Sequence, residues 1–148
     1  MGLLDSTEEH PESKLRRYLI TALAFIVLLA GTLWYLLRYH TEKVTVHHFM
    51  TALVAGDMQR AYQIWQPSPS YTMKDFLDDW GPTGFYGPVK SYTVERPEHI
   101  KDGPAAAVTV DVSPYETYPR DDPAKEVRTK KVVLWVQFKD QSISFPPE

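Results

Sequence analysis

The sequence predicts an α+β protein: one N-terminal transmembrane helix, then three short helices packed on an antiparallel sheet of about four strands. Three observations support this prediction. Residues 18–37 carry no charge, residues 44–80 have apolar residues at helical spacing, and from Tyr92 onward apolar and polar residues alternate. Helical patterns that precede strand patterns along the chain are typical of the α+β class.

Length and composition limit the functions open to the chain. Its 148 residues leave room for one domain of usual size plus an appendage. A formal net charge of −3 argues against nucleic-acid binding, which normally needs a clustered basic surface. The sequence contains no cysteine, so disulfides, thiolate metal sites and a cysteine nucleophile are excluded. We expect no cofactor.

The expected transmembrane helix covers residues 18–39. A helix of about 20 apolar residues spans roughly 30 Å, the hydrocarbon thickness of a bilayer. Tyr18, Trp34 and Tyr35 stand where aromatic rings prefer the membrane interface. A cleaved secretory signal is the alternative, but its apolar region would be only about 7–15 residues long and would end at small residues. We therefore favour an anchor.

Basic residues predict the orientation of this helix. Arg16 and Arg17 follow Lys14 on its N-terminal side, whereas Arg38 and Lys43 flank the other end. Cytoplasmic flanks carry the excess of Lys and Arg. The sequence therefore predicts a membrane protein with a cytoplasmic N-terminus and a periplasmic or extracellular C-terminal domain.

Two further boundaries follow from composition. Residues 1–17 are expected to be a disordered cytoplasmic tail, and residues 41–148 an α+β domain outside the cytoplasm. The tail begins "MGLLDS", which fits the N-myristoylation pattern with Gly2 as acceptor. The adjacent apolar helix already provides an anchor, so we do not expect this modification.

Three helices are predicted in the first half of the domain. Their apolar stripes are Val46, Phe49, Met50 and Leu53, then Met58, Ala61, Tyr62 and Trp65, then Met73, Phe76, Leu77 and Trp80. Gly56 is expected to end the first helix and Asp57 to cap the second. Thr72 and Asp75 predict a capping box at the start of the third.

The second half of the domain has the period of strands. The alternating rows are Tyr92 and Val94, then Ala106, Val108, Val110 and Val112, then Val132, Leu134, Val136 and Phe138, then Ile143 and Phe145. These rows predict four strands.

The stretch "FMTALVAGDMQRAYQIW" resembles the opening of nuclear-transport-factor-2-like domains, a superfamily of cystatin-like α+β cones. The residues that carry the resemblance are Phe49, Ala52, Leu53, Gly56, Asp57, Ala61 and Tyr62. The resemblance covers about residues 44–145 and implies helices wrapped on a curved sheet. In enzymes of this superfamily a Tyr or His with an Asp commonly lies inside the cone. No residue here can be matched to such a catalytic position.

Gly81, Gly84 and Gly87 raise the question of a phosphate-binding loop. Such a loop follows a strand and precedes a helix, so that the helix N-terminus faces the anion. Here the order is helix and then strand, so the glycines indicate a corner. Gly81 is expected to cap the preceding helix in left-handed geometry, since Pro82 prevents its continuation.

The polar candidates for chemistry are weak. His47 and His48 are adjacent, whereas two ligands on one helix need a spacing of three or four residues, so no metal site is predicted. Asp75, Asp78 and Asp79 fall opposite the apolar stripe and predict a solvated acidic face. Asp78 and Asp79 lie in the last turn, where the helix dipole disfavours negative charge, so a basic partner could contact them.

Two larger surfaces are candidates for binding. Tyr62, Trp65, Trp80 and Tyr92 could line an apolar pocket, although aromatic residues at this spacing are more often core. Val133 and Trp135 fall on the outer sheet face, and Trp is enriched at the centre of protein interfaces. Two other interpretations stay open: an inverted register, or coverage of this face by the proline-rich segment 113–127.

The predicted function is therefore a single-pass, membrane-anchored, non-catalytic protein-interaction module. Its expected partners are the lipid bilayer and either a membrane-protein complex, as an accessory or assembly subunit, or a second copy of the chain. The alternative is a small-molecule-binding or isomerase- or hydrolase-like domain that uses the apolar cone pocket.

Overall fold

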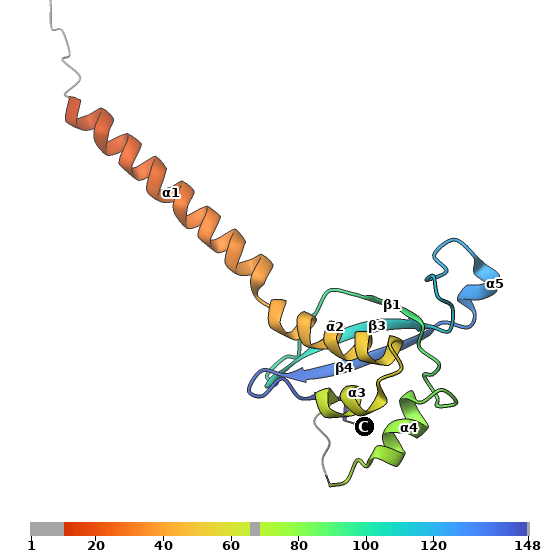
Figure 1. The fold of residues 1–148 in the computed structure, drawn as a ribbon. Coiled ribbons are helices and arrows are strands. Elements are labelled where there is room, and N and C mark those ends of the chain that lie inside the picture. Colours follow the sequence, from red (N-terminus) through yellow and green to blue (C-terminus); the bar gives the residue numbers. More distant parts are fainter. Residues whose placement is uncertain (1–10, 66–68, 148) are drawn as a thin grey trace, which may run out of the picture. The chain divides into compact units, whose positions relative to one another are not determined.

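The computed structural model describes residues 11–65 and 69–147, and it contains a long helix and an α+β domain (Figure 1). The helices are α1 (Pro11–Leu37), α2 (His40–Val54), α3 (Met58–Trp65), α4 (Met73–Trp80) and α5 (Pro123–Glu126). The strands are β1 (Ser91–Val94), β2 (Glu98–His99), β3 (Ala105–Ser113), β4 (Lys130–Gln137) and β5 (Ile143–Ser144). The predicted α+β class, with a long apolar helix before the domain, is confirmed.

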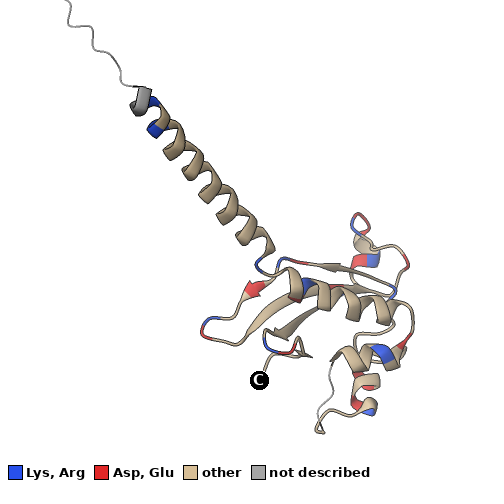
Figure 2. Cartoon of the chain, turned by 60° about the vertical axis from the view of Figure 1, so that its left-hand side comes forward, with Lys and Arg blue, Asp and Glu red and all other residues tan. Residues whose placement is uncertain are grey.

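Helix α1 exposes its apolar side chains along its whole described length. From Leu15 onward the exposed fraction of each large apolar side chain lies between 52% at Leu37 and 74% at Tyr18. Lys and Arg residues stand near its N-terminal end, and the helix carries no charge after Arg17 (Figure 2). The helical run is long and apolar enough to cross a membrane.

The boundaries of the N-terminal part differ from the expected ones. The helix begins at Pro11, so residues 11–17 are helical and are not part of an unstructured tail. The remainder of the expected tail, including Gly2, lies outside the described residues. Chain contacts divide the protein into two compact units, with the boundary between Arg38 and Tyr39.

Helices α2, α3 and α4 form as their apolar stripes predict. Gly56 ends α2 with a φ of 74°, and the Asp57 carboxylate accepts the Arg60 backbone N–H at 3.0 Å at the start of α3. The capping box of α4 is present, because Thr72 and Asp75 each accept the other's backbone N–H. One expected inward residue is wrong: Leu77 is 38% exposed, because the eight-residue helix α4 buries Phe76 and Trp80 instead.

The sheet is antiparallel and has five strands rather than four. Its order is β1-β3-β4-β5, and β2 pairs with β3 beside β1. Strand β2 has only two residues and lacks an apolar row, which is why the sequence pattern does not reveal it. Phe138, expected on the inner face, follows the end of β4, is 38% exposed and stacks on His99.

The core lies between the helices and one face of the sheet. Helix α2 packs across β1, β3 and β4 (Figure 1). The inward rows are the predicted ones, since Val108 and Val110 of β3 and Val132, Leu134 and Val136 of β4 are buried. The register of β4 is therefore the predicted register, and the inverted alternative is wrong.

Candidate functional site

Two of the four aromatic residues expected to line a pocket are core residues. Trp65 and Trp80 are 4% and 0% exposed, and their ring centroids are 5.9 Å apart. Phe49 contacts Trp80 edge-on at 5.1 Å, and Phe145 lies 4.9 Å from the Trp65 ring. Offset and edge-to-face pairs at these distances are favourable packing arrangements. These rings fill the space between the helices and the sheet.

The other two aromatic residues lie at the margin of the core and face different neighbours. The Tyr62 hydroxyl donates to the Tyr71 carbonyl oxygen at 3.0 Å. The Tyr92 hydroxyl lies 3.1 Å from His47 Nδ1, on the side where α2 meets β1. The structure therefore does not bring Tyr62 and Tyr92 together around one opening.

The backbone N–H groups of the glycine-containing corner, residues 81–87, donate hydrogen bonds within the corner and to the end of α4. The backbone N–H groups of Phe85 and Tyr86 donate to the carbonyl oxygens of Asp78 and Asp79 at 2.9 and 2.7 Å. Those of Gly84 and Gly87 donate to carbonyl oxygens of the corner itself, at 2.9 and 3.2 Å. These four donors satisfy carbonyl groups and are not available to an anion. The segment is a corner, as predicted.

Close approach explains the glycines of this corner better than backbone handedness does. Gly81 has a φ of −64° and an extended ψ of 172°, so the expected left-handed cap is wrong. A Cβ on Gly87 would lie 1.8 Å from the Gly81 carbonyl oxygen. Only glycine at position 87 lets the two backbone segments come this close.

The three aspartates of α4 have three different environments. Asp75 belongs to the capping box, and the hydrogen bonds from Thr72 lower the pKa of its carboxyl. Asp78 is exposed. Asp79 is only partly exposed and accepts a hydrogen bond from the Tyr71 hydroxyl at 2.6 Å. The negative charge of Asp79 in the last helical turn therefore has a structural partner. Of the three, Asp78 is the one whose carboxylate makes no hydrogen bond to another described residue.

The Tyr71–Asp79 hydrogen bond predicts an alkaline transition. Burial, followed by the hydrogen bond to Asp79 and its charge, raises the pKa of Tyr71 well above its usual value. The contribution of this tyrosine to stability is therefore complete below about pH 10 and is lost as the pH rises through its folded-state pKa.

We expect Tyr71→Phe to lower the free energy of unfolding by about 1–2 kcal/mol at neutral pH. This is below the full value of a hydrogen bond to a charged group, because Asp79 keeps part of its surface in water. Urea unfolding measures the loss. In an alkaline titration the tyrosinate absorbance of the variant should show one late-titrating tyrosine fewer than the wild type, since burial and the charge of Asp79 also raise the pKa of Tyr86. A variant as stable as the wild type would contradict this interpretation.

The two adjacent histidines of α2, His47 and His48, lie in different environments. His47 is partly buried against Tyr92, and burial lowers its pKa, with the charges of Lys43 and His48 acting in the same direction. His48 is exposed on a different side of the helix. Within the described residues no group of three or more His, Cys, Asp or Glu side chains could hold a metal ion.

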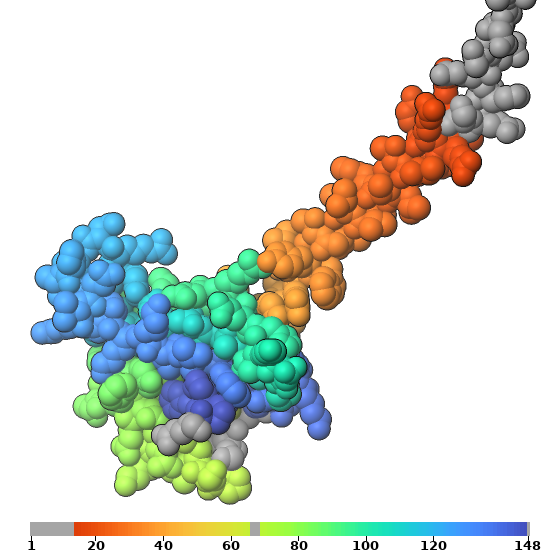
Figure 3. Space-filling model, turned by 180° about the vertical axis from the view of Figure 1, so that it is seen from behind, coloured from red at the N-terminus to blue at the C-terminus, as the bar shows by residue number. Residues whose placement is uncertain are grey.

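The outer face of the sheet keeps an apolar centre. We define it by Val133 and Trp135 of β4 with their partners Thr109 and Ala107 of β3. Val133 is 36% exposed and Trp135 is partly exposed, so the segment before β4 does not cover this face completely. Figure 3 shows the strands at the surface on the side away from α2.

Charged side chains border this outer sheet face. The Lys131 ammonium lies 2.7 Å from Glu95 Oε1 and 3.8 Å from Asp111 Oδ1. These exposed ion pairs add little stability in water. They place an apolar patch beside a charged rim, which is the usual arrangement at protein interfaces.

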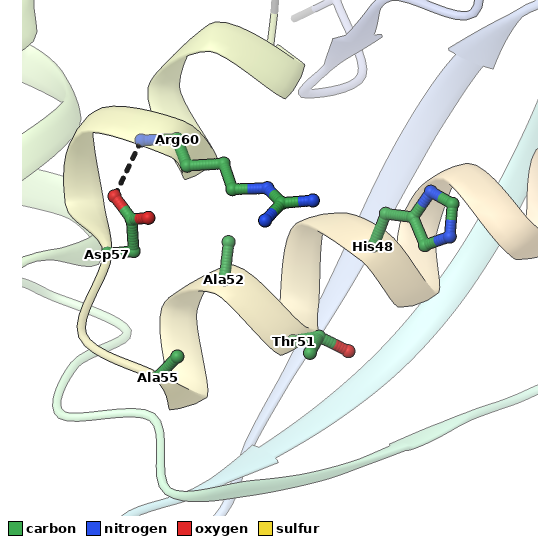
Figure 4. Close-up of a pocket in the computed structure, with 6 residues that line it drawn as sticks. All are labelled: His48, Thr51, Ala52, Ala55, Asp57 and Arg60. Atoms are coloured by element: carbon green, nitrogen blue, oxygen red, sulfur yellow. Dashed lines mark hydrogen bonds between the residues drawn. The ribbon is translucent and has the colours of Figure 1, made fainter.

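A hollow of about 130 Å³ opens on the other side of the domain, at the α2–α3 junction (Figure 4). It is lined by His48, Thr51, Ala52, Ala55, Asp57 and Arg60. The sequence analysis does not single out Arg60. The only sequence signal for this hollow is the turn between the two helices, because its wall comes from both of them.

A buried carboxylate at the start of α2 has no signal in the sequence pattern. Glu42 in the first turn of α2 is buried, and its Oε1 accepts a hydrogen bond from Gln141 Nε2 at 3.2 Å. The Gln141 Oε1 in turn accepts from the Thr45 hydroxyl at 3.0 Å. Gln141 has a φ of 58° in the turn before β5. This network fastens the start of α2 to the end of the sheet.

Comparison with known proteins identifies no relative of this chain. No family model, no curated protein and no solved structure matches the chain.

Proposed function

We propose that the chain is a single-pass membrane protein whose C-terminal domain is a non-catalytic interaction module. The single observation that carries the proposal is that every large apolar side chain of α1 from Leu15 onward is more than half exposed. Fully burying one large apolar side chain is worth about 1.5–3 kcal/mol. Between Leu15 and Leu37 fifteen large apolar side chains are exposed. A helix with so many exposed apolar side chains needs an apolar environment, and a bilayer provides one of the right thickness.

The orientation follows from the charges at the ends of α1. Lys14, Arg16 and Arg17 precede the apolar run, and Arg38 and Lys43 follow it. The excess of basic residues on the first side supports a cytoplasmic N-terminus. In that arrangement residues 41–148 lie in the periplasm or outside the cell.

The domain itself supports binding more than catalysis. The rings of Trp65 and Trp80 are buried and fill the interior between the helices and the sheet, which supports a packed core over an open apolar pocket. We propose a nuclear-transport-factor-2-like domain, because helices α2, α3 and α4 precede an antiparallel sheet and pack on one of its faces. Its function would then depend on its surface.

The outer sheet face is the proposed partner surface. Its centre combines the exposed Val133 with a partly exposed Trp135, and a one-sided antiparallel sheet normally presents polar residues to water. The proposed partner is a membrane-protein complex, in which this chain is an accessory or assembly subunit, or a second copy of the chain.

Trp135→Glu tests this surface. We expect the free energy of unfolding to fall by only about 1 kcal/mol, since the residue is partly exposed. We expect partner capture from mild-detergent extracts, or dimer formation, to fall at least about tenfold, because a charge replaces an interface tryptophan.

The matched control is Val127→Glu, which places the same charge at a residue that is 84% exposed in the β3–β4 connection. This variant should keep the partner. A Trp135→Glu protein that unfolds, or one that keeps its full set of partners, would refute the outer sheet face as the partner surface.

A further inference from the structure

The α2–α3 hollow contains an arginine, Arg60, whose charge has no partner among the residues that the structure describes. The backbone N–H of Arg60 donates to the Asp57 carboxylate at 3.0 Å, but within the described part of the chain its guanidinium makes no hydrogen bond or ion pair. Figure 4 shows this side chain extending over Ala52 toward His48 and away from the Asp57 carboxylate. The guanidinium donors therefore point into the hollow.

The other walls divide into apolar and polar parts. Ala52 and Ala55 of α2 supply methyl groups and no polar side-chain atom. His48 supplies a ring N–H. The Thr51 hydroxyl already donates its proton to the His47 carbonyl oxygen at 2.7 Å, so it adds no donor for an anion. The hollow thus combines one guanidinium, one imidazole and a small apolar floor.

We propose that the α2–α3 hollow binds a single carboxylate carried on a short alkyl chain. Arg60 is the main cationic partner, His48 donates a second hydrogen bond, and Ala52 and Ala55 contact the alkyl part. The ligand is either a free short-chain organic acid or the side chain of a Glu or Asp on another protein. The site lies in the helical layer and is independent of the outer sheet face.

Geometry and charge favour a carboxylate over a phosphate. The planar guanidinium fork matches two carboxylate oxygens. Asp57 brings a negative charge to the rim of the hollow, and this charge opposes a dianion more strongly than a monoanion. A volume of about 130 Å³ accommodates a group of a few heavy atoms.

The test uses the full chain in detergent micelles and propionate as the probe. Binding is followed by NMR through the Arg60 Nε–H and the backbone amides of α2 and α3, with chloride at equal ionic strength as the reference. For an exposed site and so small a ligand we expect a dissociation constant on the order of 10 mM. Absence of saturable shifts at these resonances would overturn the proposal.

Two substitutions should change the affinity in opposite directions. Arg60→Gln should weaken propionate binding about fivefold, and the matched control Arg128→Gln, at another exposed arginine, should leave it unchanged. Asp57→Asn keeps a good N-cap side chain and removes the opposing charge, so it should strengthen binding about twofold to fivefold. Equal weakening by all three substitutions would mean a non-specific charge effect and would contradict the assignment.

Binding measurements with two other probes, a glutamate peptide and inorganic phosphate, identify the ligand class. A blocked tripeptide with a central Glu, compared with its Gln counterpart, reports whether a protein side chain enters the site. Tighter binding of the Glu peptide than of propionate supports a partner protein, and tighter binding of propionate supports a free acid. Stronger binding of inorganic phosphate than of either carboxylate would overturn the carboxylate assignment.

Discussion

Replacing Ala24 and Leu28 together by lysine is expected to release the protein from the membrane. Both positions lie near the middle of the uncharged run of α1, one helical turn apart. Each lysine at the centre of a spanning helix costs about 2.5–3.5 kcal/mol, so the pair costs about 5–7 kcal/mol. The fraction that stays in the membrane pellet after alkaline carbonate extraction measures the effect.

The control for this variant adds the same two charges elsewhere. Ala124→Lys with Val127→Lys places them on exposed positions of the β3–β4 connection. This control protein should stay in the pellet like the wild type. If the α1 variant also stays there, α1 does not anchor the protein through its apolar length.

Trp80→Ala is expected to give the largest loss of stability within the domain. The side chain is fully buried and contacts Phe49, Trp65, Tyr86 and Phe145. Removing a buried Trp typically costs about 3–5 kcal/mol through lost contacts and the cavity left behind. The free energy of unfolding of a typical domain is only about 5–15 kcal/mol, so this loss is a large part of it. Urea unfolding of residues 39–148 measures the loss.

The same measurement separates a core from a ligand pocket. Val127→Ala, at an exposed residue, should change the free energy of unfolding by no more than about 0.5 kcal/mol. If Trp80→Ala were equally harmless, the aromatic residues would not be the packed interior of the domain. An apolar pocket lined by Tyr62, Trp65, Trp80 and Tyr92 would then again be a candidate binding site.

Local patterns explain how much of the fold the sequence predicts. Gly56 ends α2, Asp57 caps α3, and the Thr72–Asp75 capping box starts α4. Each of these features depends on residues that are no more than a few positions apart in the chain. Alternation places the buried rows of β3 and β4 correctly. Such features depend on short-range spacing, which a single sequence displays directly.

Features that depend on distant residues are not predicted. Strand β2 exists because it pairs with β3, and its two residues have no alternation of their own. Gly87, six residues after Gly81, comes so close to it that a Cβ on Gly87 would lie 1.8 Å from the Gly81 carbonyl oxygen. The hydrogen bond that gives Asp79 a partner comes from Tyr71 in the preceding turn of the chain. Helix periodicity alone contains none of these contacts.

The candidate sites show the same division. Periodicity places Val133 and Trp135 on the outer sheet face, where they lie. It also groups Tyr62, Trp65, Trp80 and Tyr92 as inward residues, but it cannot say whether rings from other elements, such as Phe145, fill the space between them. The α2–α3 hollow depends on the angle at which two helices meet, which no sequence pattern specifies.

The most direct test of the proposed function is a protease-protection measurement on the full-length protein in right-side-out vesicles of the membrane that holds it. For this measurement one epitope tag is added before Met1 and another after Glu148. The proposal predicts that added protease removes the C-terminal tag and digests residues 41–148, while the N-terminal tag survives with a fragment of about the size of α1. Loss of the N-terminal tag with survival of the C-terminal tag would contradict the orientation, and protection of both tags would contradict the exposed domain.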